Sequence, residues 1–214
     1  MQGPSILKIN EIFWSFQGEG LRVGVPSIFL RLAGCSVQCP YCDTKDSWES
    51  DAGAALSMSI EEILPVIEKH KKKYPRSQVV ITGGEPLEQD LSGITAALKK
   101  KNNFLSIETN GLHFQDLPVD WWTVSPKDVT GYFIHRELLK KINEIKLVVD
   151  KNLAVDVIKR TRALVPVSVP IFLQPEANDK DRYINTFSLF RQCQEEKLEN
   201  TRCGIQLHKI YEVK

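Results

Sequence analysis

Three cysteines lie close together in the stretch Cys35-Ser36-Val37-Gln38-Cys39-Pro40-Tyr41-Cys42, directly after an apolar segment. Thiols with this C-x3-C-x2-C spacing can turn their sulfurs toward one point. Three thiolates do not complete a tetrahedral structural zinc site, and the stretch lacks the fourth cysteine of ordinary ferredoxin patterns. The spacing therefore favours an iron–sulfur cluster with one iron open to another molecule, and a zinc or structural site is the alternative.

The composition is that of an ordinary globular protein. At 214 residues the chain has room for one domain with a sizeable core. Its 28 basic and 27 acidic residues balance, which does not predict a nucleic-acid partner. No stretch approaches the roughly 18 uncharged apolar residues of a membrane span, and no secretory leader is visible. Five cysteines, three of them crowded together, suit metal in a reducing compartment better than a disulfide framework, so we expect a cytoplasmic protein without a membrane partner.

Short apolar strands alternate with helices along most of the chain. Such alternation predicts βαβ units and a parallel sheet. Because a closed eight-fold barrel typically needs about 250 residues, we predict an α/β fold with an open, partial (β/α) barrel of about six strands, in a single domain over residues 1–214. Strands are expected at 6–13, 27–33, 78–82, 104–108, 121–124, 145–149, 171–173 and 204–207, helices at 59–73, 89–101, 135–142, 152–163 and 180–197, and an irregular loop at 45–57.

Polar turns follow several of the predicted strands. In parallel α/β folds, ligands bind beyond the carboxyl ends of the strands. Each turn alone is weak evidence, because Gly, Pro and Asn are ordinary turn residues. Five turns on one rim predict a binding site there, and they begin with Cys35, Gly83-Gly84-Glu85-Pro86, Thr109-Asn110-Gly111, Ser125-Pro126-Lys127 and Gln174-Pro175-Glu176.

At this point the chain resembles the radical S-adenosylmethionine (SAM) superfamily, through its cysteine spacing and the Gly-Gly-Glu-Pro block after the next strand. More narrowly, it resembles the 7-carboxy-7-deazaguanine synthase family of queuosine biosynthesis. The blocks that carry this resemblance run in family order: Phe16-Gln17-Gly18-Glu19-Gly20, Arg31-Leu32-Ala33-Gly34-Cys35, Tyr41-Cys42-Asp43-Thr44, Thr82-Gly83-Gly84-Glu85-Pro86, Glu108-Thr109-Asn110-Gly111, Ser125-Pro126-Lys127 and Gln174-Pro175.

The resemblance implies that Cys35, Cys39 and Cys42 ligate a [4Fe–4S] cluster whose open iron binds SAM. An electron from the cluster would cleave SAM to methionine and an adenosyl radical, and SAM would be regenerated after the reaction. Tyr41 could instead be an ordinary core aromatic. The positions that match SAM contacts of the family are Tyr41, Cys42, Asp43, Gly84, Ser125, Pro126, Lys127, Gln174, Pro175, Glu176 and Ala177.

The resemblance also implies the substrate, 6-carboxy-5,6,7,8-tetrahydropterin, and its ring contraction to 7-carboxy-7-deazaguanine with loss of ammonia by a lyase. Thr44 matches the protein ligand of a Mg2+ ion bound to the substrate carboxylate, with helix capping as the alternative role. The positions matching substrate contacts are Phe16, Gln17, Gly18, Arg31 and Thr82, although Arg31 could be a surface charge of its strand. A flavodoxin or ferredoxin as electron donor, and a homodimer, are the family expectations.

Two other functions remain open from the residues. One is another small radical SAM enzyme, such as a glycyl-radical activase, and the other is a noncatalytic iron–sulfur or zinc-binding module. Cys193 and Cys203 are predicted to be buried thiols outside the site. His208 lies in a C-terminal tail whose ending does not obviously match the family, so its role also stays open.

Overall fold

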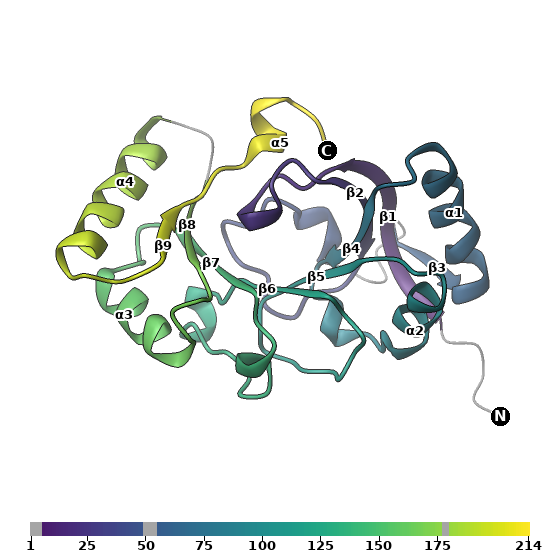
Figure 1. Ribbon diagram of the computed structural model, residues 1–214, viewed down its shortest axis with the longest axis horizontal. Helices are drawn as coiled ribbons and strands as arrows, with labels where there is room; N and C mark the ends of the chain where they lie inside the picture. Colours follow the sequence, from purple (N-terminus) through teal and green to yellow (C-terminus); the bar gives the residue numbers. More distant parts are fainter. Residues whose placement is uncertain (1–5, 49–54, 177–179) are drawn as a thin grey trace. The chain divides into compact units, whose positions relative to one another are not determined.

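The computed structural model describes residues 6–48, 55–176 and 180–214 (Figure 1). The chain divides into two compact units, which are described one at a time. Unit 1 comprises the described part of Met1–Phe16, Val25–Thr109 and His113–Trp122, and unit 2 comprises that of Gln17–Gly24, Asn110–Leu112 and Thr123–Lys214. The single domain expected over residues 1–214 stays a prediction.

The strands of unit 1 combine an antiparallel and a parallel part. They are β1 (Ile6–Phe16), β2 (Pro26–Leu32), β3 (Leu56–Ser59), β4 (Gln78–Gly83) and β5 (Leu105–Thr109), in the spatial order β3-β1-β2-β4-β5. β1 runs antiparallel to β2 and β3, whereas β2, β4 and β5 are parallel. β2 and β4 are buried along most of their length, as apolar runs of a parallel sheet predict. Their carboxyl ends therefore lie side by side.

Two helices of unit 1 cover its strands: α1 (Ile60–Lys73) and α2 (Ser92–Lys100). α1 begins at the predicted capping box, in which Ser59 and Glu62 bond reciprocally, and it buries Ile63 and Ile67. α2 begins three residues later than predicted. A 3-10 helix, η3 (Pro86–Glu88), precedes it, and the Asp90 carboxylate accepts a hydrogen bond from the Ser92 amide just before the helix. That local bond offers the chain a turn in place of a helical start.

Unit 2 holds β7 (Glu144–Val149), β8 (Ile171–Pro175), β9 (Thr201–Cys203) and the end of β6 (Trp121–Val124), paired in parallel in the order β6-β7-β8-β9. α3 (Val155–Leu164) and α4 (Lys180–Glu195) connect β7, β8 and β9. α5 (Leu207–Ile210) lies near the chain end. Together with β2, β4 and β5, the strands β6 to β8 make six strands before the last one, β9, in agreement with the predicted number of about six.

Three sequence expectations were wrong. Residues 135–142 form only the short 3-10 helix η5 (Leu138–Lys140), because the Lys141 amide bonds the carbonyl of Leu138 three residues back. The last strand is β9 at 201–203 rather than 204–207. The Gly204 amide still bonds Leu173, but α5 then begins at Leu207. Of the stretch 45–57, which was expected to be irregular, residues 49–54 lie outside the described part of the chain, and the described ends contain the 3-10 helix η2 (Lys45–Ser47) and the start of β3.

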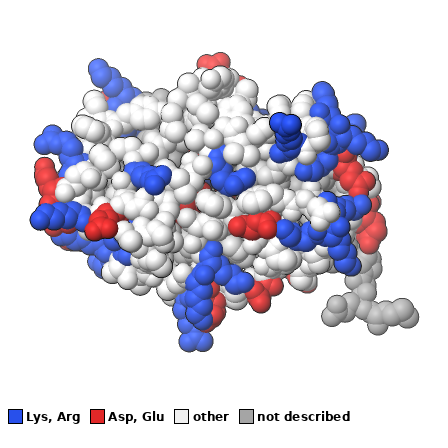
Figure 2. Space-filling view, viewed as in Figure 1, with Lys and Arg blue, Asp and Glu red and all other residues white. Residues whose placement is uncertain are grey.

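Unit 2 also contains two 3-10 helices, η1 (Gly20–Arg22) and η4 (Asp128–Thr130). On the face shown in Figure 2, basic and acidic side chains are interspersed. Within the part of the chain that the structure describes, no helix is both long and apolar enough to span a bilayer.

Candidate active site

The cysteine loop begins where β2 ends. Two backbone hydrogen bonds join its start to the segment 44–48: the Gly34 amide donates to the Ser47 carbonyl (2.8 Å), and the Cys35 amide donates to the Trp48 carbonyl (3.1 Å). Ser47 is fully buried and its hydroxyl donates to the Thr44 carbonyl (2.6 Å). The loop therefore leaves the sheet in a defined direction.

The three thiols of the loop differ in exposure. Cys39 is buried, whereas Cys35 and Cys42 are half-buried. The Cys42 amide bonds the Cys39 carbonyl (3.0 Å), which closes a turn between the last two thiols. Burial raises the pKa of the Cys35 thiol, partly offset by the amides of Gln38 and Val37 that face its sulfur. A thiolate at this position therefore needs a nearby positive charge, which a metal supplies.

None of the five cysteines, all of them described, forms a disulfide bond. Among the described residues, no group of three His, Cys, Asp or Glu side chains is arranged to hold a single metal ion. A four-iron cluster takes its thiolates on separate irons, so its ligands need not converge as zinc ligands do. The donor set, three thiols on one anchored loop, fits such a cluster. Cys193 is buried as predicted, but Cys203 is exposed because it lies on the edge strand β9.

The glycine pair Gly83-Gly84, whose first member ends β4, packs against the start of the cysteine loop. A Cβ on Gly84 would collide with the backbone carbonyls of Gly34 and Ser47, so no side chain fits there. The Gly84 amide donates to the Leu32 carbonyl (2.9 Å), and the Glu85 amide donates to that of Gly34 (2.8 Å). The amides of Gly84 and Glu85 are therefore hydrogen-bonded within the fold. The close packing at Gly84 brings the end of β4, the start of the cysteine loop and the segment at Ser47 into contact.

Two acidic side chains, Glu85 and Glu88, stabilise the glycine pair and the cysteine loop through hydrogen bonds. Glu85 is 1% exposed, and one of its carboxylate oxygens accepts hydrogen bonds from the Leu87 amide (3.0 Å) and the Thr109 hydroxyl (2.7 Å). Glu88 accepts hydrogen bonds from the amide (3.1 Å) and the hydroxyl (2.6 Å) of Ser36. Glu85 therefore links the ends of β4 and β5, and Glu88 fastens the cysteine loop to η3. Sequence reasoning missed Ser36 and Glu88, and no local pattern marked them.

Thr44 lies two residues after Cys42, the last cysteine of the loop. Its hydroxyl lies 3.6 Å from the Cys42 sulfur, and it makes no side-chain capping bond to η2. The capping role considered from the sequence is therefore absent here. Asp43 is exposed and Tyr41 is half-buried. A hydroxyl next to the cysteine loop suits a magnesium ion, which usually takes few protein ligands.

Arg31 and Thr82 face each other across the parallel pair β2 and β4. The Arg31 side chain is only 18% exposed, and its Nε donates to Glu11 Oε1 (3.0 Å) while its guanidinium lies over the Phe13 ring (5.6 Å to the centroid). It is therefore not a solvated surface charge. Thr82 is 9% exposed, and Phe16, half-buried, ends β1 in the same unit.

In unit 2, the turn after β1 is tightly held. Gln17 is buried, its side-chain oxygen accepts a hydrogen bond from the Glu19 amide (3.1 Å), and its carbonyl accepts one from Gly24 (2.7 Å). The Gly18 carbonyl accepts a hydrogen bond from the Leu207 amide (2.9 Å). The start of α5 thus lies against this turn, whereas the functional role of the tail stays a prediction.

Ser125, Pro126 and Lys127 follow β6 in unit 2. The Lys127 ammonium donates to the Ser125 hydroxyl (2.8 Å), and both side chains are half-buried. Pro126 is buried. A lysine held this way presents a positive charge beside the carboxyl end of the strand, where an anionic group of a ligand is stabilised.

Gln174 lies at the carboxyl end of β8. It is 3% exposed, yet its Nε2 and Oε1 have no hydrogen-bond partner among the described residues. A buried polar group is normally hydrogen-bonded, and an exception calls for an explanation such as a ligand. Gln174 is therefore the clearest sign in unit 2 that the end of β8 is built for a polar ligand.

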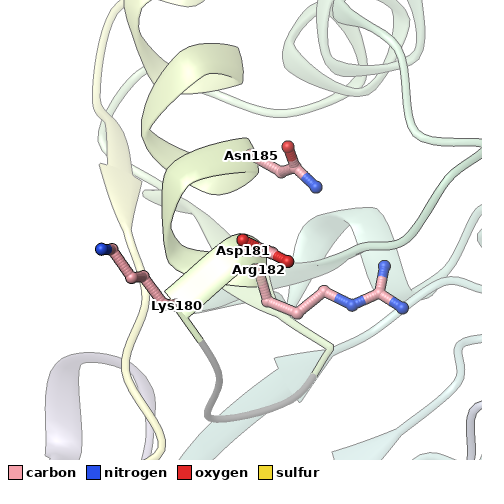
Figure 3. Close-up of a pocket in the computed structure, with 4 residues that line it drawn as sticks. All are labelled: Lys180, Asp181, Arg182 and Asn185. Carbon is pink, nitrogen blue, oxygen red and sulfur yellow. The ribbon is translucent and has the colours of Figure 1, made fainter.

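The residues that follow Gln174 lead toward a surface pocket. Pro175 is buried, and Glu176 is paired with Arg182 (2.9 Å). Figure 3 shows Arg182 and its neighbours at the start of α4, where they line a cavity of about 440 Å3 formed by Lys180, Asp181, Arg182 and Asn185. Ala177 lies outside the described residues.

The predicted residues thus fall into two sets. Unit 1 brings together the cysteine loop, Thr44 and the glycine pair, and it also carries Arg31, Thr82, Phe16, Tyr41 and Asp43. Unit 2 carries the turn at Gln17 and Gly18, the Ser125–Lys127 segment and the residues from Gln174 onward. Sequence reasoning missed Lys146, which is buried in β7 beside the turn. A lysine inside the apolar run 145–149 was the available signal.

A three-cysteine loop that follows a parallel strand of an α/β fold and packs on a Gly-Gly-Glu-Pro turn defines a class, the radical SAM proteins. The model of the radical SAM superfamily matches residues 30–184. The 7-carboxy-7-deazaguanine synthase of Aquifex aeolicus (strain VF5) is 34% identical over 220 residues, covering 98% of this chain and 95% of the relative. That of Escherichia coli (strain K12) is 35% identical over 227 residues, covering 96% and 98%.

A solved structure agrees. The crystal structure of QueE from Escherichia coli matches with a TM-score of 0.78 and 34% identity, covering 95% of each chain. The chain belongs to the 7-carboxy-7-deazaguanine synthase family of the radical SAM superfamily. The predicted fold class, an α/β fold with an open, mostly parallel sheet of the radical SAM type, is confirmed.

Proposed function

We propose that the protein is a 7-carboxy-7-deazaguanine synthase, a radical SAM lyase that contracts the ring of 6-carboxy-5,6,7,8-tetrahydropterin in queuosine biosynthesis. Product and ammonia together contain the atoms of the substrate, so the overall reaction needs no net oxidant. The observation that carries the proposal is the nearly full-length match to synthases of this name, in a chain whose three-cysteine loop is anchored by the glycine pair.

The family implies a [4Fe–4S] cluster and SAM as cofactors. When bound, they supply the reducing electron and the group that removes a hydrogen atom from the substrate. Cys35, Cys39 and Cys42 would hold the cluster, on a loop whose start is fixed by Ser47 and Trp48. The fit rests on the donor set and on the tight packing at Gly84.

The remaining SAM contacts are proposed residue by residue. The unpartnered amide of Gln174 has the hydrogen-bonding capacity for a polar group of SAM, and Lys127 has the charge for its carboxylate. The other proposed contacts follow from the family motif and include Tyr41, Cys42, Asp43, Gly84, Ser125, Pro126, Pro175, Glu176 and Ala177.

For the substrate we propose contacts from Phe16, Gln17, Gly18, Arg31 and Thr82. A flat bicyclic pterin needs amide-type hydrogen bonds along its edge and a polar or cationic clamp for its carboxylate. The turn at Gln17 supplies main-chain groups of the first kind, and Arg31 supplies the cation. Thr44 would be the protein ligand of a Mg2+ ion on the substrate carboxylate, with the remaining ligands coming from the substrate and water.

The setting of the enzyme is also a proposal. We infer a cytoplasmic homodimer that receives electrons from a flavodoxin or ferredoxin and has no nucleic-acid or membrane partner. The balanced charge and the interspersed surface charges support only the part of this setting that concerns nucleic acid. Sedimentation of the reconstituted protein measures the oligomeric state directly, and a monomer at micromolar concentration would contradict the dimer.

The experiment that tests the function is anaerobic. The protein is reconstituted with iron and sulfide and incubated with carboxytetrahydropterin, SAM, Mg2+ and a reductant. The expected products are 7-carboxy-7-deazaguanine and ammonia, with SAM recovered. SAM cleavage without deazaguanine would indicate another radical SAM enzyme, such as an activase. One zinc per chain and no labile sulfide would indicate a noncatalytic module.

A further inference from the structure

A buried ion pair holds the turn that follows β1. The Lys146 ammonium of β7 contacts Glu19 Oε2 at 2.6 Å, and the two side chains are 7% and 15% exposed. The other carboxylate oxygen of Glu19 accepts a hydrogen bond from the Gln206 side chain (2.9 Å). One carboxylate thus joins three separate segments of unit 2: the turn, β7 and the stretch before α5.

A second glutamate, Glu144, is hydrogen-bonded to the other end of the same turn, at Leu21. Glu144 lies two residues before Lys146 in β7, so both side chains point to the same face of that strand. Its Oε2 accepts a hydrogen bond from the Leu21 amide (2.6 Å), and its Oε1 accepts one from the Thr123 hydroxyl (2.8 Å). The turn is therefore held at Glu19 and at Leu21, on either side of Gly20.

The chain end completes the arrangement. The Leu207 amide bonds the Gly18 carbonyl (2.9 Å), and the His208 ring lies so close to Gly18 that a Cβ there would collide with its Nδ1. Because Gln206 bonds Glu19 and Leu207 bonds Gly18, the turn and the tail form one hydrogen-bonded body. Moving either segment would break contacts to the other.

The stability of the fold does not by itself require Glu19 and Lys146 to be charged. Removing two charges from water carries a large penalty, and well-packed apolar residues often stabilise a fold as well as a buried ion pair does. A buried ion pair instead fixes direction, because its oxygens must meet particular donors. Burial raises the pKa of Glu19, but the charge and hydrogen bond of Lys146, the hydrogen bond of Gln206 and the charge of His208 outweigh it and lower the pKa to about 2. The carboxylate therefore stays ionised at neutral pH.

We propose that Glu19 and Lys146 are positioning residues for the substrate, which fix the Gln17–Gly18 turn against the Gln206–His208 segment so that the turn presents its hydrogen-bonding groups to the pterin edge. This inference rests on the proposed function, since the turn is taken as the pterin-binding element. Neither side chain is assigned a contact with the reacting atoms.

The test compares Glu19→Gln and Lys146→Met with the wild type. Lys159→Met is the matched control, because it removes another lysine–glutamate pair of unit 2 (Lys159 to Glu196, 2.9 Å) whose side chains are 38% and 47% exposed. Hydrogen–deuterium exchange on the unloaded full chain should show the Leu207 and Gly24 amides exchanging at least about tenfold faster in both site variants, and unchanged in the control.

Kinetics on the reconstituted enzyme give the second measurement. The KM for carboxytetrahydropterin should rise about 10- to 100-fold, since small misplacements of a binding element have effects of about 100-fold. The kcat at saturating pterin should change less than about threefold, and the affinity for SAM should stay at its wild-type value. Lys146→Arg, which keeps the charge, should recover most of the pterin KM.

Several outcomes would overturn the proposal. An unchanged pterin KM in Glu19→Gln would do so, as would an equal loss of pterin and SAM affinity, which indicates general unfolding. If Lys146→Met does not fold, the neutral double variant Glu19→Gln with Lys146→Met replaces it. A wild type that makes no deazaguanine refutes the proposed function instead. The exchange rates then still decide the positioning role, and unchanged rates at Leu207 and Gly24 would end it.

Discussion

Replacing Gln174 by leucine should make the protein without SAM more stable. The side chain is 3% exposed at the end of β8, and both of its polar atoms lack a partner among the described residues. An unsatisfied buried polar group costs about 1–3 kcal/mol. Leucine has a similar size and no polar atoms to leave unpaired. The expected gain is therefore about 1–3 kcal/mol in the free energy of unfolding, or about 2–4 °C in melting temperature for each kcal/mol in a chain of this size.

The same substitution should weaken SAM binding. If the amide of Gln174 bonds SAM, its loss removes about 1 kcal/mol or more, which corresponds to a rise of about fivefold or more in the SAM dissociation constant. Stability is measured by urea denaturation of the unloaded protein, and SAM affinity by equilibrium binding to the anaerobically reconstituted protein. Opposite signs of the two effects are the signature of a polar group retained for a ligand.

Gln78→Leu is the matched control. Gln78 is 2% exposed in β4, but its Nε2 donates to the Ser27 hydroxyl (2.9 Å) and its Oε1 accepts from the Ser106 hydroxyl (3.0 Å). Its replacement leaves two buried hydroxyls without their partner and should destabilise by about 1–3 kcal/mol. The reasoning is refuted if Gln174→Leu destabilises as Gln78→Leu does, or if SAM affinity is unaltered.

Four further predictions follow from the site. Gly84→Ala should lower the free energy of unfolding by about 1–3 kcal/mol and reduce the bound iron, because its methyl group meets backbone oxygens. In Gly131→Ala, where that methyl group meets nothing within 4 Å, iron content should be normal, and equal iron in both variants would contradict the packing argument. Cys39→Ala should keep the fold but lose the cluster, as measured by iron and labile sulfide, and undiminished activity would speak against its role as a ligand. Thr44→Val should keep the cluster absorption and lose the dependence of the pterin KM on Mg2+, so an unaltered Mg2+ response would exclude it as a ligand. Finally, the Glu19 pKa is lowered from 4.5 to about 2 in the folded protein. Its ionised form therefore stabilises the fold, by at most about 3 kcal/mol, above the unfolded pKa, and this stabilisation is lost as the pH falls from about 4.5 toward 2. Urea denaturation across that range should show the difference between the wild type and Glu19→Gln shrinking, and a constant difference would contradict the pKa assignment.

Local signals predicted much of the fold. The run Val79-Val80-Ile81 is apolar, β-branched and fully buried in β4. The capping box of Ser59 and Glu62 placed the start of α1 correctly. Such signals act between neighbours in the chain, so they survive without knowledge of the rest of the molecule.

The errors have a common cause. Residues 135–142 carry buried Leu138 and Ile142 at helical spacing, yet only a 3-10 turn forms, and the His135 amide bonds the distant Gly111 carbonyl. The last strand was placed three residues late, because pairing with β8 rather than apolar pattern decides where β9 lies. Short segments depend on their partners in the sheet, and their own periodicity is a weak guide.

The sequence by itself determined the three-cysteine loop, the start of α1 and the position of most of the parallel strands, because periodicity, capping and spacing are properties of adjacent residues. Only the tertiary structure decided that Gly84 must lack a side chain, that Gln174 keeps a buried amide without a partner, and that Glu19 meets Lys146 and Gln206. Glu19 is separated from Lys146 by 127 positions in the sequence and from Gln206 by 187 positions. Contacts over such separations arise from packing of the sheet and its loops, so no local pattern specifies them.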